Sequence, residues 1–253
     1  MLVDNSDESW ETLGRTDPYY GVLTDHRFRR ENLGPDARRE FFASGVSHMT
    51  ELLQRIEAHL GPITRGQALD FGCGVGRLVL PLARDAAFKH AVGMDISDSM
   101  LREAGANAAR ELISNVEFVK SDDTLSRLTG GFDFVHSFIV LQHIPIERGE
   151  AIVHHLLHSL SPGGVAALQV PFARHVGNIR EFASALRLKF KPLHCVANLV
   201  RGRPWNEPPM QMNRYDMNSL LEVFQACGMR HVTAEFLNDG GNIGAYLFAR
   251  KGR

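Results

Sequence analysis

A run of alternating glycines gives the chain its clearest chemical signature. The segment reads Asp70-Phe71-Gly72-Cys73-Gly74-Val75-Gly76 and follows two apolar residues, so an apolar strand leads into a glycine-rich loop. Because glycine lacks a Cβ atom, such a loop lets a ligand approach the backbone closely, although a tight strand-to-helix connection needs the same residues. The dinucleotide-binding fingerprint requires a glycine where Arg77 stands, and the spacing therefore disfavours a nicotinamide cofactor.

Two carboxylates follow the next two apolar runs of the chain. Asp95 comes directly after the run at 91–94, and Asp122 follows the run at 116–119. If these runs are neighbouring parallel strands, both side chains reach the edge of the sheet where the glycine loop lies. There Asp95 is placed to accept both hydroxyls of a ribose, and Asp122 to accept from an adenine amino group. An isolated Asp is more often a turn or helix-cap residue, but three such strand ends in succession favour a ligand site.

A histidine leaves the fourth apolar run at the same edge. The run at 132–141 continues into Gln142-His143-Ile144-Pro145, which places His143 where the predicted sheet ends. Since histidine with an ordinary pKa of about 6.5 can accept the proton of a hydroxyl group, His143 is either the general base or a structural contact at this edge. His136 lies within the run and is interpreted as a buried structural residue. No metal site is expected at three further histidines, which fit an exposed helix face: His154, His155 and His158.

The elements that must position these residues are visible in the hydrophobic pattern. From residue 67 to about 171, short apolar runs alternate with helical periodicity, which is the βαβ rhythm of a parallel sheet. The turn-rich stretch at 238–242 separates two later runs and favours a hairpin, hence an antiparallel edge. The predicted strands are 68–71, 91–94, 116–119, 132–141, 165–170, 230–236 and 244–248, and the predicted helices are 46–60, 77–87, 98–113, 148–160 and 217–227.

With these motifs in order, residues 67–171 resemble the class I S-adenosylmethionine-dependent methyltransferase family. The matching features are the glycine loop, Asp95, Asp122, the Phe132-Asp133-Phe134-Val135 strand and the Leu160-Ser161-Pro162-Gly163-Gly164 turn. The resemblance implies an α/β, Rossmann-like fold with a seven-stranded sheet, mostly parallel with one antiparallel strand, and helices on both faces. It also implies that S-adenosylmethionine lies across the carboxyl ends of the first strands.

The resemblance assigns roles to individual residues. Gly72, Cys73 and Gly74 are expected to contact the amino-acid moiety of the cofactor, and Asp70 to support the glycine loop through backbone amides. Asp95 is expected to hold the ribose, Ile96 to flank the adenine and Asp122 to bond its amino group. Further expected cofactor contacts are Tyr20, Met100, Ser121 and Phe138.

Three segments flank or interrupt the core at 46–171. Residues 1–45 form an arm whose Trp10 and Tyr20 either close over the cofactor or pack on the first helix. Residues 172–214 are an insert expected to bind the acceptor through Asn213, Arg214 and Tyr215, and residues 215–253 complete the sheet. Within the insert, residues 172–205 contain one acid, Glu181, among seven basic residues: Arg174, Arg180, Arg187, Lys189, Lys191, Arg201 and Arg203.

The basic insert favours an anionic or polyhydroxylated acceptor, although a solvated face or a contact with a membrane surface or partner fits the same pattern. The chain as a whole carries a net charge of -1, which gives no field that would attract nucleic acid. Three widely spaced cysteines argue against a disulfide framework or zinc ribbon, and neither a signal peptide nor a membrane span is apparent. A cytoplasmic location is therefore expected.

These features predict a methyltransferase that modifies a hydroxyl of a sugar, a glycan precursor or a natural product. The fourth strand is followed by Leu141-Gln142-His143-Ile144 and not by the Asn-Pro-Pro-aromatic tetrad of many base-amine methyltransferases, so a nucleic-acid substrate is not expected. Methylation of a small amine and a catalytically inactive, cofactor-binding subunit stay open as alternatives. A nicotinamide-dependent reductase is a third, which binding of NADH in place of S-adenosylhomocysteine would support.

Overall fold

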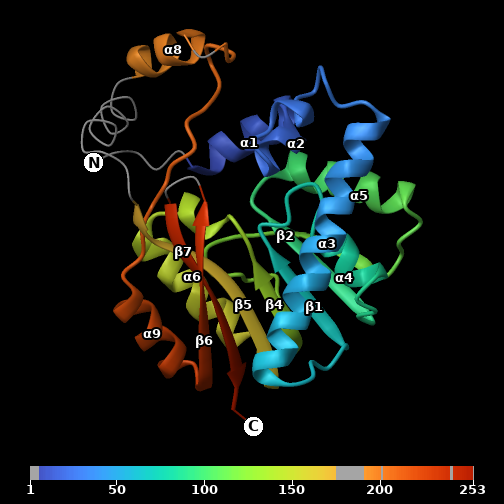
Figure 1. Cartoon of the computed structure of the whole chain (residues 1–253), viewed down its shortest axis with the longest axis vertical. Coiled ribbons are helices and arrows are strands. Elements are labelled where there is room, and N and C mark those ends of the chain that lie inside the picture. The colour runs from blue at the N-terminus through green and yellow to red at the C-terminus, as the bar shows by residue number, and fades with distance from the viewer. Residues whose placement is uncertain (1–5, 175–190, 201, 240–241, 253) are drawn as a thin grey trace.

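Seven strands form one mixed sheet in the order β3-β2-β1-β4-β5-β7-β6 (Figure 1). The computed structural model of the chain describes residues 6–174, 191–200, 202–239 and 242–252. Strand β7 runs antiparallel to β5 and β6, and the other pairs are parallel. This is the fold class predicted from the sequence. The strands are β1 Gln67–Phe71, β2 His90–Asp95, β3 Val116–Lys120, β4 Phe132–Ser137, β5 Leu160–Arg174, β6 Met229–Asp239 and β7 Asn242–Lys251.

Helices cover both faces of the sheet, as Figure 1 shows. Side chains alternate along the strands, so Leu69 and Val135 join the apolar layer under α6 and α9, whereas Phe134 and Phe248 join the layer under α3, α4 and α5. The helices are α1 Ser6–Thr16, α2 Pro18–Val22, α3 Pro35–Leu60, α4 Val79–Arg84, α5 Asp98–Arg110, α6 Ile146–His158, α8 Lys191–Val200 and α9 Met217–Ala226, with 3-10 turns η1 His26–Phe28 and η2 Leu141–His143.

Helix α3 begins eleven residues earlier than its hydrophobic periodicity predicts, at Pro35 and not at 46. Proline suits the first helical position because its fixed φ matches the helix and its missing N–H would have no partner there. The first eleven residues of α3 bury only Phe41 and Gly45. An apolar stripe therefore could not reveal this half of the helix, and the expected boundary at residue 45 falls inside it.

The boundaries of β4 and β5 also differ from the prediction. Strand β4 ends at Ser137, four residues early, because Ile139 adopts a left-handed φ of 60° and the chain then forms η2. Strand β5 begins at Leu160, so the predicted turn lies within it as an irregularity: Phe132 pairs with Leu160, and the next pair is Phe134 with Val165. The predicted hairpin is confirmed by the β6–β7 register, and residues 240–241 lie outside the described residues.

Helices α1 and α2 of the N-terminal arm lie across the carboxyl ends of the parallel strands (Figure 1). Glu11 of α1 accepts hydrogen bonds from the hydroxyls of Ser97, at 2.7 Å, and Ser99, at 2.6 Å, where α5 begins. Gly14 makes this approach feasible, since a Cβ atom there would lie 2.5 Å from Ser97 Oγ. The arm is therefore docked on the strand ends through polar contacts. None of the described helices combines the length and apolar character that a membrane span needs.

Candidate active site

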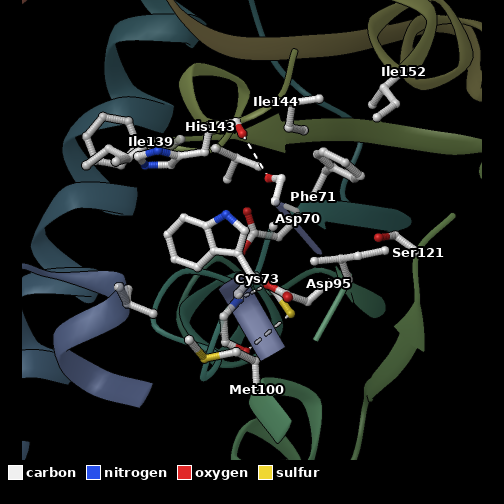
Figure 2. A pocket seen from close by; sticks show the side chains of 18 of the residues that line it. Asp70, Phe71, Cys73, Asp95, Met100, Ser121, Ile139, His143, Ile144 and Ile152 are labelled. Carbon is white, nitrogen blue, oxygen red and sulfur yellow. Dashed lines mark hydrogen bonds between the residues drawn. The ribbon is translucent and has the colours of Figure 1, made fainter. Parts of the chain in front are cut away.

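A cavity opens at the carboxyl ends of β1, β2, β3 and β4, beneath α1 and α2. It brings the dispersed sequence motifs together, and Figure 2 shows Cys73, Asp95 and Met100 on one side with Ile139, His143 and Ile144 on the other. Of the residues predicted to bind the cofactor, all but Tyr20 line the cavity: Asp70, Gly72, Cys73, Gly74, Asp95, Ile96, Met100, Ser121, Asp122 and Phe138.

The glycine loop is held by backbone hydrogen bonds to the neighbouring strand. The amides of Gly72 and Cys73 donate to the carbonyl oxygen of Met94, at 2.7 and 3.0 Å. Gly72 and Gly74 have φ of +74° and +54°, a conformation that other residues rarely adopt. A Cβ atom would lie 2.2 Å from Val140 at Gly72 and 2.5 Å from Val22 at Gly74. The loop therefore needs glycine both for its conformation and for its close contact with the arm and the β4 loop.

Asp70 does not support the glycine loop through backbone amides, and that prediction was wrong. Its Oδ1 lies 2.8 Å from Nδ1 of His136, and both side chains are buried. The two residues are register partners on β1 and β4 and point to the same face, so a buried carboxylate finds a buried donor. His136 continues the network to the hydroxyl of Tyr246, 3.4 Å away, which lies 2.9 Å from Nε2 of His48. His136 is thus the buried structural residue that was expected.

Asp95 supplies the contact to the glycine loop instead. Its Oδ2 accepts from the amide of Gly74 at 2.8 Å, and its Oδ1 accepts from the amide of Ser97 at 2.9 Å. Removal from water raises the pKa of Asp95 to about 6, although these backbone hydrogen bonds favour the ionised form. The carboxylate thus joins the loop after β1 to the start of α5 and lines the cavity.

Asp122 lines the cavity and also organises the turn after β3. Its Oδ1 accepts from the amide and hydroxyl of Thr124, at 3.0 and 2.9 Å, and from the amide of Ser126 at 3.0 Å. The hydroxyl of Ser126 donates to Oδ2, and these hydrogen bonds, that hydroxyl first, lower the pKa of Asp122. The turn-cap interpretation therefore holds, and the contact with adenine stays a prediction for the same carboxylate.

His143 lies in the cavity wall on η2 with a defined tautomer. Its Nδ1 lies 2.6 Å from the carbonyl oxygen of Gln211, which can only accept, so Nδ1 carries the hydrogen. The lone pair is then on Nε2, which lies 3.3 Å from the side-chain nitrogen of Gln142. Burial lowers the pKa of His143 to about 4, and the hydrogen bond to Gln211 only partly opposes this. His143 is therefore neutral near pH 7 by a wider margin than an ordinary histidine.

The predicted acceptor residues lie behind the cavity wall and do not line it. The hydroxyl of buried Tyr215 is 2.9 Å from the carbonyl oxygen of Leu141 and 3.0 Å from that of Ile144. The amide of Asn213 donates to the carbonyl oxygen of Gln142 at 2.6 Å, and Arg214 is exposed. These contacts join segments about seventy residues apart in sequence. Tyr215 and Asn213 thus support the turn that carries His143.

The arm contributes one aromatic side chain to the cavity and keeps another out of it. Trp10 lines the cavity with its ring centroid 4.9 Å from that of His143. Tyr20, which was expected to contact the cofactor, is buried beneath the guanidinium of Arg29, 3.3 Å from the ring centroid. Sequence spacing could not separate the two rings, because both lie in short polar segments without a helical stripe.

Arg148 of α6 closes the rim of the cavity, a role that the sequence did not indicate. Its Nη1 lies 2.8 Å from Oδ1 of Asp7 on α1, and its Nε lies 2.6 Å from Oδ1 of Asp123 after β3. The three side chains come from distant segments, so no local motif marks them. We call this set the rim ion pairs.

The basic insert contributes none of its described side chains to the cavity lining. Arg203 lies 3.4 Å from Glu207, within the insert itself. The side chains of the remaining basic residues lie outside the described residues: Arg174, Arg180, Arg187, Lys189, Lys191 and Arg201. His154 and His158 are exposed on α6, and the described residues include no group of three His, Cys, Asp or Glu side chains able to hold a metal ion.

Comparison with known proteins finds methyltransferases similar to the part of the chain that forms this site. Residues 68–164 match the model of a family described as a methyltransferase domain. The trans-aconitate 2-methyltransferase of Deinococcus radiodurans is 35% identical over 105 residues, 42% of this chain and 38% of that protein. The magnesium-protoporphyrin O-methyltransferase of Synechocystis is 38% identical over 87 residues, 34% of this chain and 37% of that protein. The aligned segments thus span less than two fifths of either relative.

The solved magnesium protoporphyrin IX methyltransferase of Synechocystis with bound SAH has the same fold, with a TM-score of 0.61 and 19% identity over 97% of this chain and 98% of that one. The methyltransferase-domain match over residues 68–164, the fold and the cavity at the strand ends together support a class I S-adenosylmethionine-dependent methyltransferase. The cavity residues suit that cofactor, because Asp95 offers a carboxylate and the left-handed glycines keep the loop free of side chains.

Proposed function

We propose that this chain transfers a methyl group from S-adenosylmethionine to a hydroxyl oxygen of a small-molecule acceptor, with His143 as general base. The observation that carries the proposal is the contact between Nδ1 of His143 and Gln211, which leaves the Nε2 lone pair of a cavity-lining residue available. A backbone carbonyl thus orients the base, as a carboxylate does in other general-base sites.

The cofactor supplies an electrophilic methyl carbon when bound. As the bond from the acceptor oxygen to that carbon forms and the carbon–sulfur bond breaks, the hydroxyl proton passes to Nε2 of His143. The side-chain nitrogen of Gln142 must release Nε2 when the acceptor enters, since it lies within hydrogen-bonding distance. Trp10 and the buried walls exclude water, and the fixed turn at 141–143 orients the acceptor for in-line transfer.

Among the acceptors expected from the sequence, the cavity favours a natural product over a bare sugar. Apolar lining side chains near His143 include Ile139, Val140, Ile144 and Trp10, while Ser6 adds a hydroxyl that donates to the carbonyl oxygen of His143 at 3.1 Å. A base whose pKa is about 4 accepts protons most readily from acidic hydroxyls such as phenols and enols. The relatives named for trans-aconitate and magnesium-protoporphyrin also support a small-molecule acceptor. Methylation of a neutral amine, which needs less help from a base, is the alternative outcome of the test.

Two measurements test the proposal. Calorimetry with S-adenosylhomocysteine and with NADH should show binding of the first only, since the cavity has the class I arrangement. Release of S-adenosylhomocysteine should then be assayed with phenolic, sugar and amine acceptors. Turnover with a hydroxyl acceptor that depends on His143 is the expected result. Turnover with amines alone, or no binding of S-adenosylhomocysteine, would overturn it.

A further inference from the structure

A second cavity, separate from the active site, is lined by three arginines. It lies between α2, η1, α3 and α5, and no residue lines both cavities. Its lining residues are Asp17, Pro18, Tyr19, Phe28, Arg30, Leu33, Arg38, Glu103 and Arg110. Three guanidinium groups from separate segments in one concave site are the arrangement that recognises an oxyanion.

Two of these guanidinium groups share a single neutral acceptor. Nη1 of Arg38 and Nη1 of Arg110 both donate to Oδ1 of Asn107, at 3.0 and 2.6 Å. One carboxylate, that of Glu103, faces the pair, 3.6 Å from Arg38 and 3.3 Å from Arg110. The other lining carboxylate, Asp17, pairs with Arg29, which lies outside the cavity lining. Positive charge is thus in excess at the site, and an added anion would relieve the repulsion between neighbouring cations.

The three arginines also keep donors available. Within the described part of the chain, Arg38 and Arg110 form side-chain hydrogen bonds through Nη1 alone, and Arg30 through Nη2, to the carbonyl oxygen of Arg15 at 3.3 Å. The remaining N–H groups of each planar fork can take two oxygens of one phosphate group. The side chains of Arg38 and Arg110 are 33% and 51% exposed, so a ligand can enter from solvent. Pro18 and Phe28 offer apolar surface beside the charges.

Asn107 connects this cavity to the glycine loop. Its side chain is 1% exposed, and its Nδ2 donates to the carbonyl oxygen of Val75 at 3.0 Å. The hydroxyl of Tyr19 lies 2.9 Å from Oδ1 of Asn107 and 2.8 Å from Oε1 of Glu103, so Tyr19 is held beside both acceptors. Tyr19 belongs to α2, whose next residues, Gly21 and Val22, line the active-site cavity. A ligand bound by the arginines is therefore connected through Asn107 to the glycine loop and through Tyr19 to α2, and both of these border the active-site cavity.

We infer that this cavity binds a small anion carrying a phosphate group, and that its occupancy strengthens cofactor binding through Asn107 and α2. The binding half of the inference is independent of the proposed function, and the coupling half rests on it. An anion that fixes Arg38 and Arg110 also fixes the amide of Asn107 under the glycine loop and holds Tyr19, and with it the arm, in place. By linkage, the cofactor must strengthen anion binding by the same factor.

Inorganic phosphate is the probe, and Arg39→Gln is the matched control. Arg39 neighbours Arg38 on α3, but it is 74% exposed, pairs with Asp36 and does not line the cavity. The melting temperature and the Kd of S-adenosylhomocysteine should be measured with phosphate against sodium chloride of equal ionic strength. In the wild type and in Arg39→Gln, phosphate should raise the melting temperature and lower the Kd about fivefold. In Arg38→Gln and Arg110→Gln, both effects should disappear.

Each result decides a separate half of the inference. If phosphate raises the melting temperature through Arg38 and Arg110 while S-adenosylhomocysteine does not bind, the anion site stands and the proposed function fails. If S-adenosylhomocysteine binds with a Kd that phosphate does not change, the coupling is refuted. Equal responses to phosphate and to sodium chloride, or equal responses in all three variants, would overturn the anion site itself.

Discussion

Nδ1 of His143 lies 2.6 Å from the carbonyl oxygen of Gln211, and the two residues are 68 positions apart in sequence. The insert that was expected to bind the acceptor therefore fixes the tautomer of the candidate base. Because the proton is held on Nδ1, Nε2 is the atom that can accept a proton from the acceptor. The chemistry at the cavity thus depends on a contact between the fourth-strand turn and the segment before α9.

Replacing His143 by Gln should lower kcat by about 100- to 10,000-fold, the usual contribution of a general base. The loss should shrink as the pH approaches the pKa of the acceptor hydroxyl, because the ionised acceptor needs no base. The Kd of S-adenosylhomocysteine should change less than twofold. His154→Gln, on the exposed face of α6, is the control. An unchanged kcat in His143→Gln would show that the residue is a neighbour and takes no part in proton transfer.

The pKa of about 6 at Asp95 predicts a pH dependence of cofactor binding. Ribose hydroxyls donate to an ionised carboxylate, so protons compete with the cofactor once the pH falls below about 6. The Kd of S-adenosylhomocysteine should be constant above pH 7 and rise about tenfold for each pH unit below 6, as for one linked proton. Calorimetry across this range measures it. Asp95→Asn should bind S-adenosylhomocysteine weakly at every pH. A wild-type Kd that does not change with pH would rule out this role for Asp95.

The free protein should show the opposite pH trend in stability. The folded-state pKa of Asp95, about 6, lies above the ordinary Asp pKa of 3.8, so the native state holds this proton more tightly than the unfolded chain. The contribution of this group is therefore fully present below about pH 4 and is lost as the pH rises through 6. Comparing the free energy of unfolding of the wild type with that of Asp95→Asn over this range isolates the effect. A constant difference would contradict the raised pKa.

The variant Tyr215→Phe tests whether Tyr215 supports the turn that carries His143 or contacts the acceptor. The hydroxyl of Tyr215 serves the carbonyl oxygens of Leu141 and Ile144, so its removal should lower the free energy of unfolding by about 1–3 kcal/mol. The kcat should fall because the turn that carries His143 loosens, while the KM for the acceptor should change little. A raised KM with unchanged stability would instead restore the original prediction that Tyr215 contacts the acceptor. Urea denaturation and steady-state kinetics make the comparison.

The sequence predicted the ends of β1, β2 and β3 well because each is local: an apolar run stops, and a glycine or carboxylate follows. The partner of Asp70 was not predictable in this way, since its contact with His136 depends on the register between β1 and β4, which no local pattern reveals. The same holds for Tyr215, whose aromatic ring fits an acceptor pocket or a buried support equally well until the fold places it. Long-range pairing, not composition, decided which predicted residues form the site.

The rim ion pairs yield the last prediction. Arg148 joins α1 to the loop after β3 through Asp7 and Asp123, whose side chains are 49% and 60% exposed. Such partly exposed pairs contribute less than about 1 kcal/mol to folding, so Arg148→Gln should leave the free energy of unfolding almost unchanged. It should nevertheless loosen α1 over the cavity and speed the release of S-adenosylhomocysteine, raising its Kd roughly threefold at low salt. High salt should raise the release rate of the wild type toward that of the variant, because screening weakens the same contacts.

Stopped-flow measurements of S-adenosylhomocysteine release at two salt concentrations test this prediction. The control is Arg84→Gln, because Arg84 pairs with Glu111 away from the cavity lining. Identical release from the wild type and Arg148→Gln would mean that the rim ion pairs do not control how α1 closes over the cavity.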